Sequence, residues 1–110
     1  TNACACVNVT CEITFPGGVI PAAVYDEDLV DQVRKTIGEV LGEEKVAKDC
    51  GGGGEDFHYF KQKKPELHAA YIGVGTGVTP GLHDPRMTMN PESLRNGVKV
   101  LEKLILNVVG

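Results

Sequence analysis

The stretch KVAKDCGGGGEDFHYF, residues 45–60, determines how this chain is expected to fold. Residues 45–50 have the length of a short strand, glycines fill 51–54, and residues 56–62 have the pattern of a short helix that ends before Pro65. A glycine in an ordered element costs about 0.5–1 kcal/mol relative to alanine, so a run of glycines implies that the backbone approaches another group closely. A strand, a glycine-rich turn and a helix in this order are typical of α/β proteins.

Two further segments have strand patterns. Residues 9–15, VTCEITF, alternate as a half-buried strand does. The side chains expected on its buried face are Val9, Cys11, Ile13 and Phe15. Residues 68–75, HAAYIGVG, form a mostly apolar run, which is typical of a strand covered on both faces.

Two longer helices are predicted by apolar periodicity. The first begins after Asp26 as N-cap and ends at Gly42. Its apolar positions are Leu29, Val30, Val33, Ile37, Val40 and Leu41. The second follows Asn90 as N-cap, with Pro91 at its first position, and runs almost to the C-terminus. Its expected apolar face is Leu94, Val98, Leu101, Ile105 and Val108.

Alternating helices and strands predict the α/β class with crossover connections. Only about three strands are visible, fewer than a parallel sheet covered on both faces normally has. The chain also starts at Thr1, within an element that is already under way. We therefore expect a fragment of a larger α/β domain.

Composition limits the class of partner. Hydrophobic residues make up 42% and charged residues 24% of the 110, close to the average of globular proteins. The formal charge is −4, and the basic residues are scattered, so nucleic acid is not expected as a partner. No run reaches the roughly 18 apolar residues of a membrane span, so no membrane partner is expected either. The four cysteines favour free thiols in a reducing compartment, with a metal or disulfide role as the less favoured alternatives, and we expect a cytoplasmic protein.

The polar residues around the glycine loop admit several interpretations. A phosphate-binding loop is disfavoured, because Glu55 and Asp56 stand where the anion would bind. Both residues are also candidates to cap the short helix, which would be a purely structural role. His58 and His68 are expected to be structural or solvated. His83, in the loop GLHDPR at 81–86, is a candidate metal ligand, although a lone loop histidine is more often solvated.

Two motifs in this order resemble a known family. GGEDFHYF at 53–60, followed by GLHDPRMTMNPESLRNGVKVL at 81–101, is similar to the C-terminal segment of the metal-dependent amidohydrolases. These include aminoacylase, hippurate hydrolase and the indole-3-acetyl-amino-acid hydrolases, within the zinc carboxypeptidase and aminoacylase-type metallopeptidases. The resemblance extends over nearly the whole chain.

The resemblance implies a domain layout and a reaction. Residues 1–16 would be the end of an inserted lid or dimerisation domain, and residues 17–110 the C-terminal part of a three-layer, zinc-exopeptidase-like catalytic domain. The full enzyme would hold two divalent metal ions, zinc or manganese, and would form a homodimer through the lid. Its substrate would be a small N-acyl amino acid or peptide, whose amide is attacked by a metal-activated water.

The resemblance also assigns site residues. His83 would be a metal ligand. Independently of the resemblance, a histidine that binds a metal through one ring nitrogen needs a partner for the other, here Asp84 or a backbone carbonyl. The residues expected on the substrate side of the same pocket are Gly53, Gly54, Glu55, Asp56 and Phe57. The other ligands and the catalytic base of the family lie upstream, so no catalytic residue is expected in these 110 residues, which should be inactive by themselves.

Two alternatives remain open. The chain could be a non-catalytic binding or scaffold module that keeps the fold without the metal site. A thiol function at Cys50 is a weaker alternative, because the acidic neighbours Asp49, Glu55 and Asp56 oppose a thiolate there.

Overall fold

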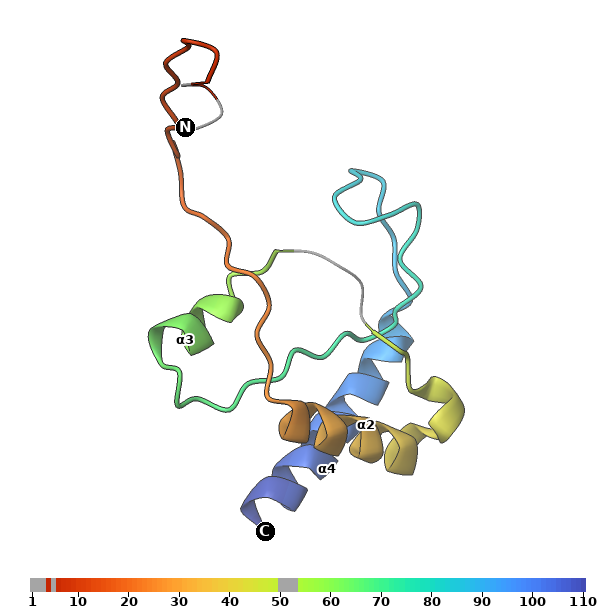
Figure 1. The fold of residues 1–110 in the computed structure, drawn as a ribbon. Helices are drawn as coiled ribbons and strands as arrows, with labels where there is room; N and C mark the ends of the chain where they lie inside the picture. The colour runs from red at the N-terminus through yellow and green to blue at the C-terminus, as the bar shows by residue number, and fades with distance from the viewer. Residues whose placement is uncertain (1–3, 5, 50–53) are drawn as a thin grey trace.

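The structure, a computed structural model, describes residue 4, residues 6–49 and residues 54–110. The elements in these ranges are helices joined by extended segments and turns (Figure 1). In chain order they are α2 (Glu27–Leu41), the 3₁₀ turn η1 (Glu43–Lys45), α3 (His58–Lys63), the 3₁₀ turn η2 (Pro91–Ser93) and α4 (Leu94–Val109). The three helices predicted from the sequence are therefore confirmed, with α3 starting two residues later than expected.

The ends of the long helices follow the predicted signals. Gly42 ends α2 with φ at 102°, a conformation that side chains rarely adopt, and its N–H donates to the Gly38 carbonyl at 2.9 Å. Asn90 precedes η2 and α4, and its side chain accepts a hydrogen bond from the Glu92 N–H at 3.1 Å. Pro91 takes the first helical position, where no backbone donor is needed. These local rules are independent of the rest of the fold.

The two long helices, α2 and α4, pack against each other. Val33 and Thr36 of α2 are buried, as is Val100 of α4. The Thr36 hydroxyl donates to the Gln32 carbonyl at 2.8 Å and accepts from the Asn107 side-chain amide at 3.4 Å. The Thr36–Asn107 hydrogen bond thus joins the two helices beside the buried Val33 and Val100.

The apolar face predicted for α4 is not the face that packs on α2. Its members are all exposed, from 45% at Leu94 to 65% at Val98. The less exposed positions are Gly97, Val100 and Leu104, each one residue before a predicted one. One residue turns an α-helix by about 100°. Contact with α2 therefore selects a different side of α4 from the side that periodicity alone favoured.

The predicted α/β fold is contradicted. In the described residues there is no strand, and the only ladder contact is an isolated antiparallel bridge between Thr79 and Thr88. Two extended segments were predicted as strands, residues 9–15 and 68–75. Neither pairs with another strand among the described residues. The segment 45–49 lacks strand structure as well, and residue 50 lies outside the described ranges. A three-layer α/β arrangement is therefore wrong for this structure.

The extended segment 68–76 is held by the helices instead of by a sheet. The Asp26 N–H donates to the Ala69 carbonyl at 3.2 Å, and the Asn90 N–H donates to the Thr76 carbonyl at 2.8 Å. Gly97 of α4 lets this segment come close, since a Cβ there would lie 3.0 Å from a methyl group of Val74. Strand-like sequence here forms a strap across the helix pair.

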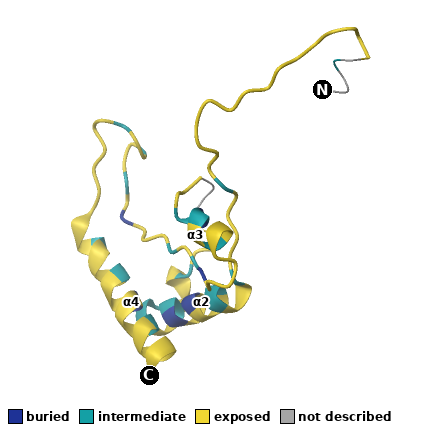
Figure 2. Cartoon of the chain, turned by 90° about the vertical axis from the view of Figure 1, so that its left-hand side faces the viewer, coloured by how far each residue is buried: buried dark blue, intermediate teal, exposed yellow. Residues whose placement is uncertain are grey.

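The chain as a whole is open. Its radius of gyration is 19.5 Å, whereas a compact domain of about 100 residues has roughly 13 Å. Residues 7–17 run away from the helices as an exposed tail (Figures 1 and 2), and beyond them the Val19 carbonyl accepts a hydrogen bond from the Tyr59 hydroxyl of α3. Among the described residues the buried hydrophobic side chains are Val33, Ala69 and Val100. None of the described helices combines the length and apolar character of a membrane span.

Candidate functional site

The loop that carries His83 is closed by a short backbone ladder. The N–H of Thr79 donates to the Thr88 carbonyl at 3.1 Å, and the N–H of Thr88 donates back to Thr79 at 2.9 Å. Within the loop the Met87 N–H donates to the Asp84 carbonyl at 2.9 Å. His83 sits in the left-handed region with φ at 67°, and its side chain is exposed. The turn thus presents an imidazole outward from a conformation that is uncommon for residues other than glycine.

Asp84 is engaged by Arg86 and not by His83. The guanidinium of Arg86 donates Nε–H to one carboxylate oxygen and Nη2–H to the other, both at 3.1 Å, and the Arg86 backbone N–H donates at 2.8 Å. These hydrogen bonds hold the pKa of Asp84 below its ordinary value. The bidentate pair rigidifies the turn on one side of His83. Of the two partners expected for the second ring nitrogen of His83, Asp84 is thus engaged by Arg86, and a backbone carbonyl stays a prediction.

The described residues do not fit a complete metal site. Within residue 4 and the ranges 6–49 and 54–110, no three side chains of His, Cys, Asp or Glu are grouped so that they could hold a cation together. A zinc site takes at least three protein ligands, and His83 offers one exposed nitrogen donor. No catalytic step through a metal is derived from these residues, and the assignment of His83 as a ligand stays a prediction.

Gly54 is where the structure explains part of the glycine run. A Cβ built at Gly54 would lie 2.5 Å from Cγ2 of Ile20 and 3.2 Å from its Cβ, distances that require something to move. The backbone here thus approaches the segment that leads from the tail into α2. Gly53 lies outside the described residues, and the substrate-side role expected for both glycines stays a prediction.

Glu55 and Asp56 join the first turn of α3 through their backbones. The His58 N–H donates to the Glu55 carbonyl at 3.2 Å, and the Tyr59 N–H donates to the Asp56 carbonyl at 3.0 Å. No side chain caps α3, and both carboxylates are exposed. The expected capping by these carboxylates is therefore not seen, and both side chains are available to solvent or to a ligand.

Phe57 belongs to a small aromatic cluster with His58. The rings of Phe57 and Tyr71 are 5.6 Å apart, and the His58 ring lies edge-on to Tyr25 at 5.4 Å. His58 is only 5% exposed, and in the described part of the chain its Nδ1 has no hydrogen-bond partner. His58 is thus a buried packing residue, whereas the side chain of His68 is 83% exposed.

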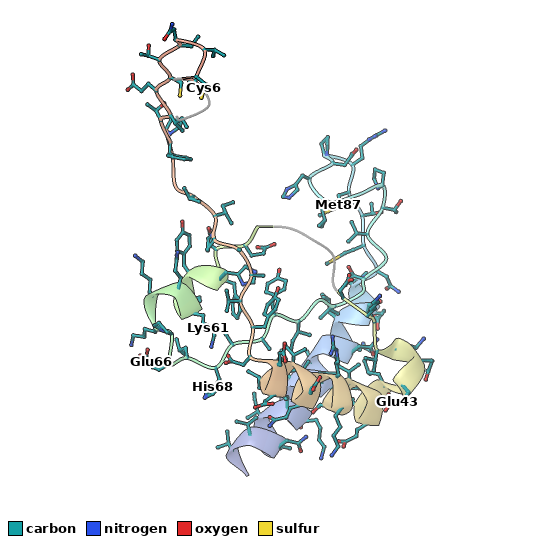
Figure 3. All side chains as sticks on the ribbon, viewed as in Figure 1. Cys6, Glu43, Lys61, Glu66, His68 and Met87 are labelled. Atoms are coloured by element: carbon teal, nitrogen blue, oxygen red, sulfur yellow. The ribbon has the colours of Figure 1, made fainter. Side chains whose placement is uncertain are left out.

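An ion pair that sequence reasoning did not find connects α3 to α2. Lys61, labelled on α3 in Figure 3, places its Nζ 2.8 Å from both carboxylate oxygens of Asp26. One of those oxygens also accepts the Ala69 N–H at 2.7 Å. The Lys61 hydrogen bond, followed by that of Ala69, lowers the pKa of Asp26. Asp26 holds the predicted N-cap position but makes no side-chain cap bond to α2. The only sequence signal was a helix-cap aspartate, which points to a local role.

In the described residues, the segment 54–57 and the turn 79–88, which belong to the two predicted halves of the site, lie apart (Figure 1). The turn 79–88 and α3 stand on different sides of the molecule (Figure 1). Among the described residues no hydrogen bond, ion pair or ring contact links His83 to the segment 54–57. Residues 51–53 of the glycine loop lie outside the described residues, so the pocket expected between that loop and the His83 loop stays a prediction.

Comparison with known proteins gives a family but no individual relative. The model of peptidase family M20/M25/M40 matches residues 2–107. A search of curated proteins and a search of solved structures found no match. The family match covers nearly the whole chain, including the turn of His83 and the segment that leads into α3. This chain belongs to peptidase family M20/M25/M40.

Proposed function

We propose that this chain is the C-terminal part of an enzyme that hydrolyses the amide bond of an N-acyl amino acid or a small peptide with the help of bound metal ions. The observation that carries the proposal is the family match over residues 2–107, which supports a metal-dependent peptidase or amidohydrolase in general terms. The order of the motifs GGEDF and GLHDPR favours the aminoacylase-like branch. On this proposal the enzyme holds two zinc or manganese ions and is a homodimer through its lid, of which residues 1–16 are the end.

The roles of individual residues follow from the same proposal. His83 would supply one metal ligand, because its exposed imidazole offers a nitrogen donor and the Asp84–Arg86 pair stiffens its turn. Glu55 and Asp56, whose carboxylates are exposed beside Phe57, would line the substrate side together with Gly53 and Gly54. The nucleophile and the remaining ligands would come from residues outside this chain.

The direct test is hydrolysis by the complete polypeptide that contains this chain. The protein would be purified with zinc or manganese and assayed against N-acetyl, N-benzoyl and N-indoleacetyl amino acids and against dipeptides. Release of the free amino acid, abolished by a chelator and restored by either metal, is the expected result. Turnover that resists exhaustive metal removal would contradict metal-dependent chemistry.

The same assay separates the enzyme from a binding module. A non-catalytic relative would release no amino acid from any member of the panel, even when metal is present. It could still bind N-acyl amino acids, which calorimetry with the same compounds would detect. Absence of turnover in the fully folded, metal-supplied protein would therefore favour the module.

A further inference from the structure

The ammonium group of Lys61 is held by acceptors from two parts of the chain, Asp26 before α2 and the turn that follows α3. Besides the Asp26 carboxylate, Nζ donates to the Leu67 carbonyl at 2.9 Å and reaches the Pro65 carbonyl at 3.4 Å. Its side chain is 15% exposed and that of Asp26 is 21% exposed. An ammonium has three protons, and all of them have acceptors here. Lys61 is thus a structural tether and not a solvated surface lysine.

The other end of this tether is itself fixed. Asp26 and Ala69 exchange two hydrogen bonds, because the Asp26 N–H donates to the Ala69 carbonyl and the Asp26 carboxylate accepts the Ala69 N–H. Asp26 also stands immediately before α2, which packs on α4. The point to which Lys61 is tied therefore belongs to the most closely packed part of the molecule.

α3 depends on such tethers for its position. It has only six residues, and isolated helices shorter than about 12–15 residues are marginal in water. His58 and Lys61 are three residues apart and so lie on the same side of the helix. His58 packs against Tyr25 and Tyr71, while Lys61 binds Asp26. One side of α3 is thus held by side-chain packing near its start and by an ion pair near its end, while on another side the Tyr59 hydroxyl donates to the Val19 carbonyl.

A shift of α3 would carry Glu55, Asp56 and Phe57 with it. The carbonyls of all three residues accept the first N–H groups of the α3 turn, at 3.0–3.2 Å. We propose that Lys61 is a positioning residue, whose ion pair with Asp26 sets where the Glu55–Phe57 segment stands. The expected effect of Lys61 on substrate binding rests on the function proposed above. Its effect on the position of residues 55–57 does not depend on that function.

The test compares two lysines of the same helix in the complete polypeptide. Lys61→Met removes the tether, and Lys63→Met is the matched control, because Lys63 is exposed and has no ion pair or side-chain hydrogen bond in the described residues. Amide hydrogen exchange is followed by mass spectrometry for peptides that cover residues 55–63 and 94–109. In Lys61→Met we expect exchange about tenfold faster or more in 55–63, with little change in α4. Lys63→Met should match the wild type in both peptides.

Kinetics on an N-acetyl amino acid give the second readout. Displacement of a substrate-side segment removes binding that the ground state and the transition state share, so KM should rise about fivefold or more in Lys61→Met, with kcat nearly unchanged. If the wild type shows no hydrolysis, the proposed function fails, and the exchange comparison alone still decides whether Lys61 positions the segment.

A double variant separates positioning from the cost of an unpaired carboxylate. Asp26→Asn combined with Lys61→Met removes the charge that Lys61→Met leaves alone, so global stability should recover. Exchange in 55–63 should nevertheless stay fast and KM high, because the tether is still missing. If Lys61→Met alone does not fold, this double variant and Asp26→Asn carry the test. Recovery of both local readouts in the double variant, or equal behaviour of Lys61→Met and Lys63→Met, would overturn the proposal.

Discussion

Val98 and Val100 are two residues apart on α4, yet Val98 is 65% exposed and Val100 only 4%. The difference arises because α2 covers the side of α4 on which Val100 lies. Burial of a valine side chain is worth about 1.5–3 kcal/mol. The same residue type therefore has two different energetic roles within one turn of helix.

Truncation of these two valines should separate the roles. Val100→Ala should lower the free energy of unfolding by about 1.5–3 kcal/mol, whereas Val98→Ala should change it by no more than about 0.5 kcal/mol. Urea denaturation followed by circular dichroism measures both variants under identical conditions. Equal losses would show that α4 also buries the Val98 side.

Replacement of Asp26 should reduce the loss of folding stability at low pH. The pKa of Asp26 is lowered in the folded state by Lys61 and by the Ala69 N–H, so its contribution is fully present above the unfolded value of about 3.9 and is lost as pH falls below it. The melting temperature of Asp26→Asn should therefore be below that of the wild type near neutral pH, and the gap should close below about pH 4. Thermal scans at a series of pH values provide the measurement.

The control for this experiment is an exposed ion pair. Asp31→Asn breaks the ion pair with Arg34. The side chain of Asp31 is 75% exposed and that of Arg34 is 51% exposed. Such pairs contribute at most about 1 kcal/mol, so this variant should melt close to the wild type. A gap between Asp26→Asn and wild type that stayed constant down to pH 3 would exclude the proposed linkage.

Removal of the cap before α4 should loosen the start of that helical run. The Asn90 side chain accepts the Glu92 N–H at 3.1 Å, and loss of such a cap costs about 1 kcal/mol. Asn90→Ala should be less stable by this amount in chemical denaturation, while Asn90→Ser keeps an acceptor and should stay near wild type. If alanine and serine behaved alike, the cap bond would contribute nothing.

Substitution of Gly54 should cost stability because of Ile20. Overpacking in a core costs about 1–3 kcal/mol, and we expect Gly54→Ala to cost about 1 kcal/mol or less because Ile20 is 56% exposed and can move. Ile20→Ala combined with Gly54→Ala should recover most of the loss, which a double-mutant cycle measures. Gly17→Ala is the matched control, since no atom lies within 4 Å of a Cβ built there. A loss at Gly54 that Ile20→Ala did not relieve would point to another cause.

Loss of the His83 imidazole should abolish the proposed activity without unfolding the protein. His83→Asn suits the left-handed backbone, because asparagine adopts φ near +60° more readily than most residues, but it lacks the imidazole. Changes in residues that merely support a metal ligand already cost 10–100-fold in affinity or activity, so loss of a ligand should cost about 100-fold or more in kcat/KM.

The metal content of His83→Asn, measured by atomic emission, distinguishes a ligand from a bystander. A ligand variant should bind less metal at the same melting temperature. Near-normal turnover with full metal content in the complete polypeptide would remove His83 from the site.

Local signals in the sequence determined the helices and their ends. The periodicity of residues 27–41, the glycine at 42, and the Asn90–Pro91 start of the last helical run each act within a few residues. The structure therefore reproduces them. The family is likewise readable from short motifs, and the family match over residues 2–107 confirms it at the level of M20 peptidases but leaves the aminoacylase-like branch a prediction.

Three features depend on tertiary structure and could not be read from the sequence: whether extended segments pair into strands, which face of α4 is buried, and which residue Asp26 binds. A strand exists only when another chain segment accepts and donates its backbone hydrogen bonds, and the extended segments 9–15 and 68–75 have no such partner in the described residues. The face that α4 buries depends on where α2 lies, and periodicity offers more than one apolar side. Asp26 has the sequence pattern of a local helix cap, yet Lys61, 35 residues away, takes its carboxylate. A charged partner at that separation is set by the path of the whole chain, which no local pattern encodes.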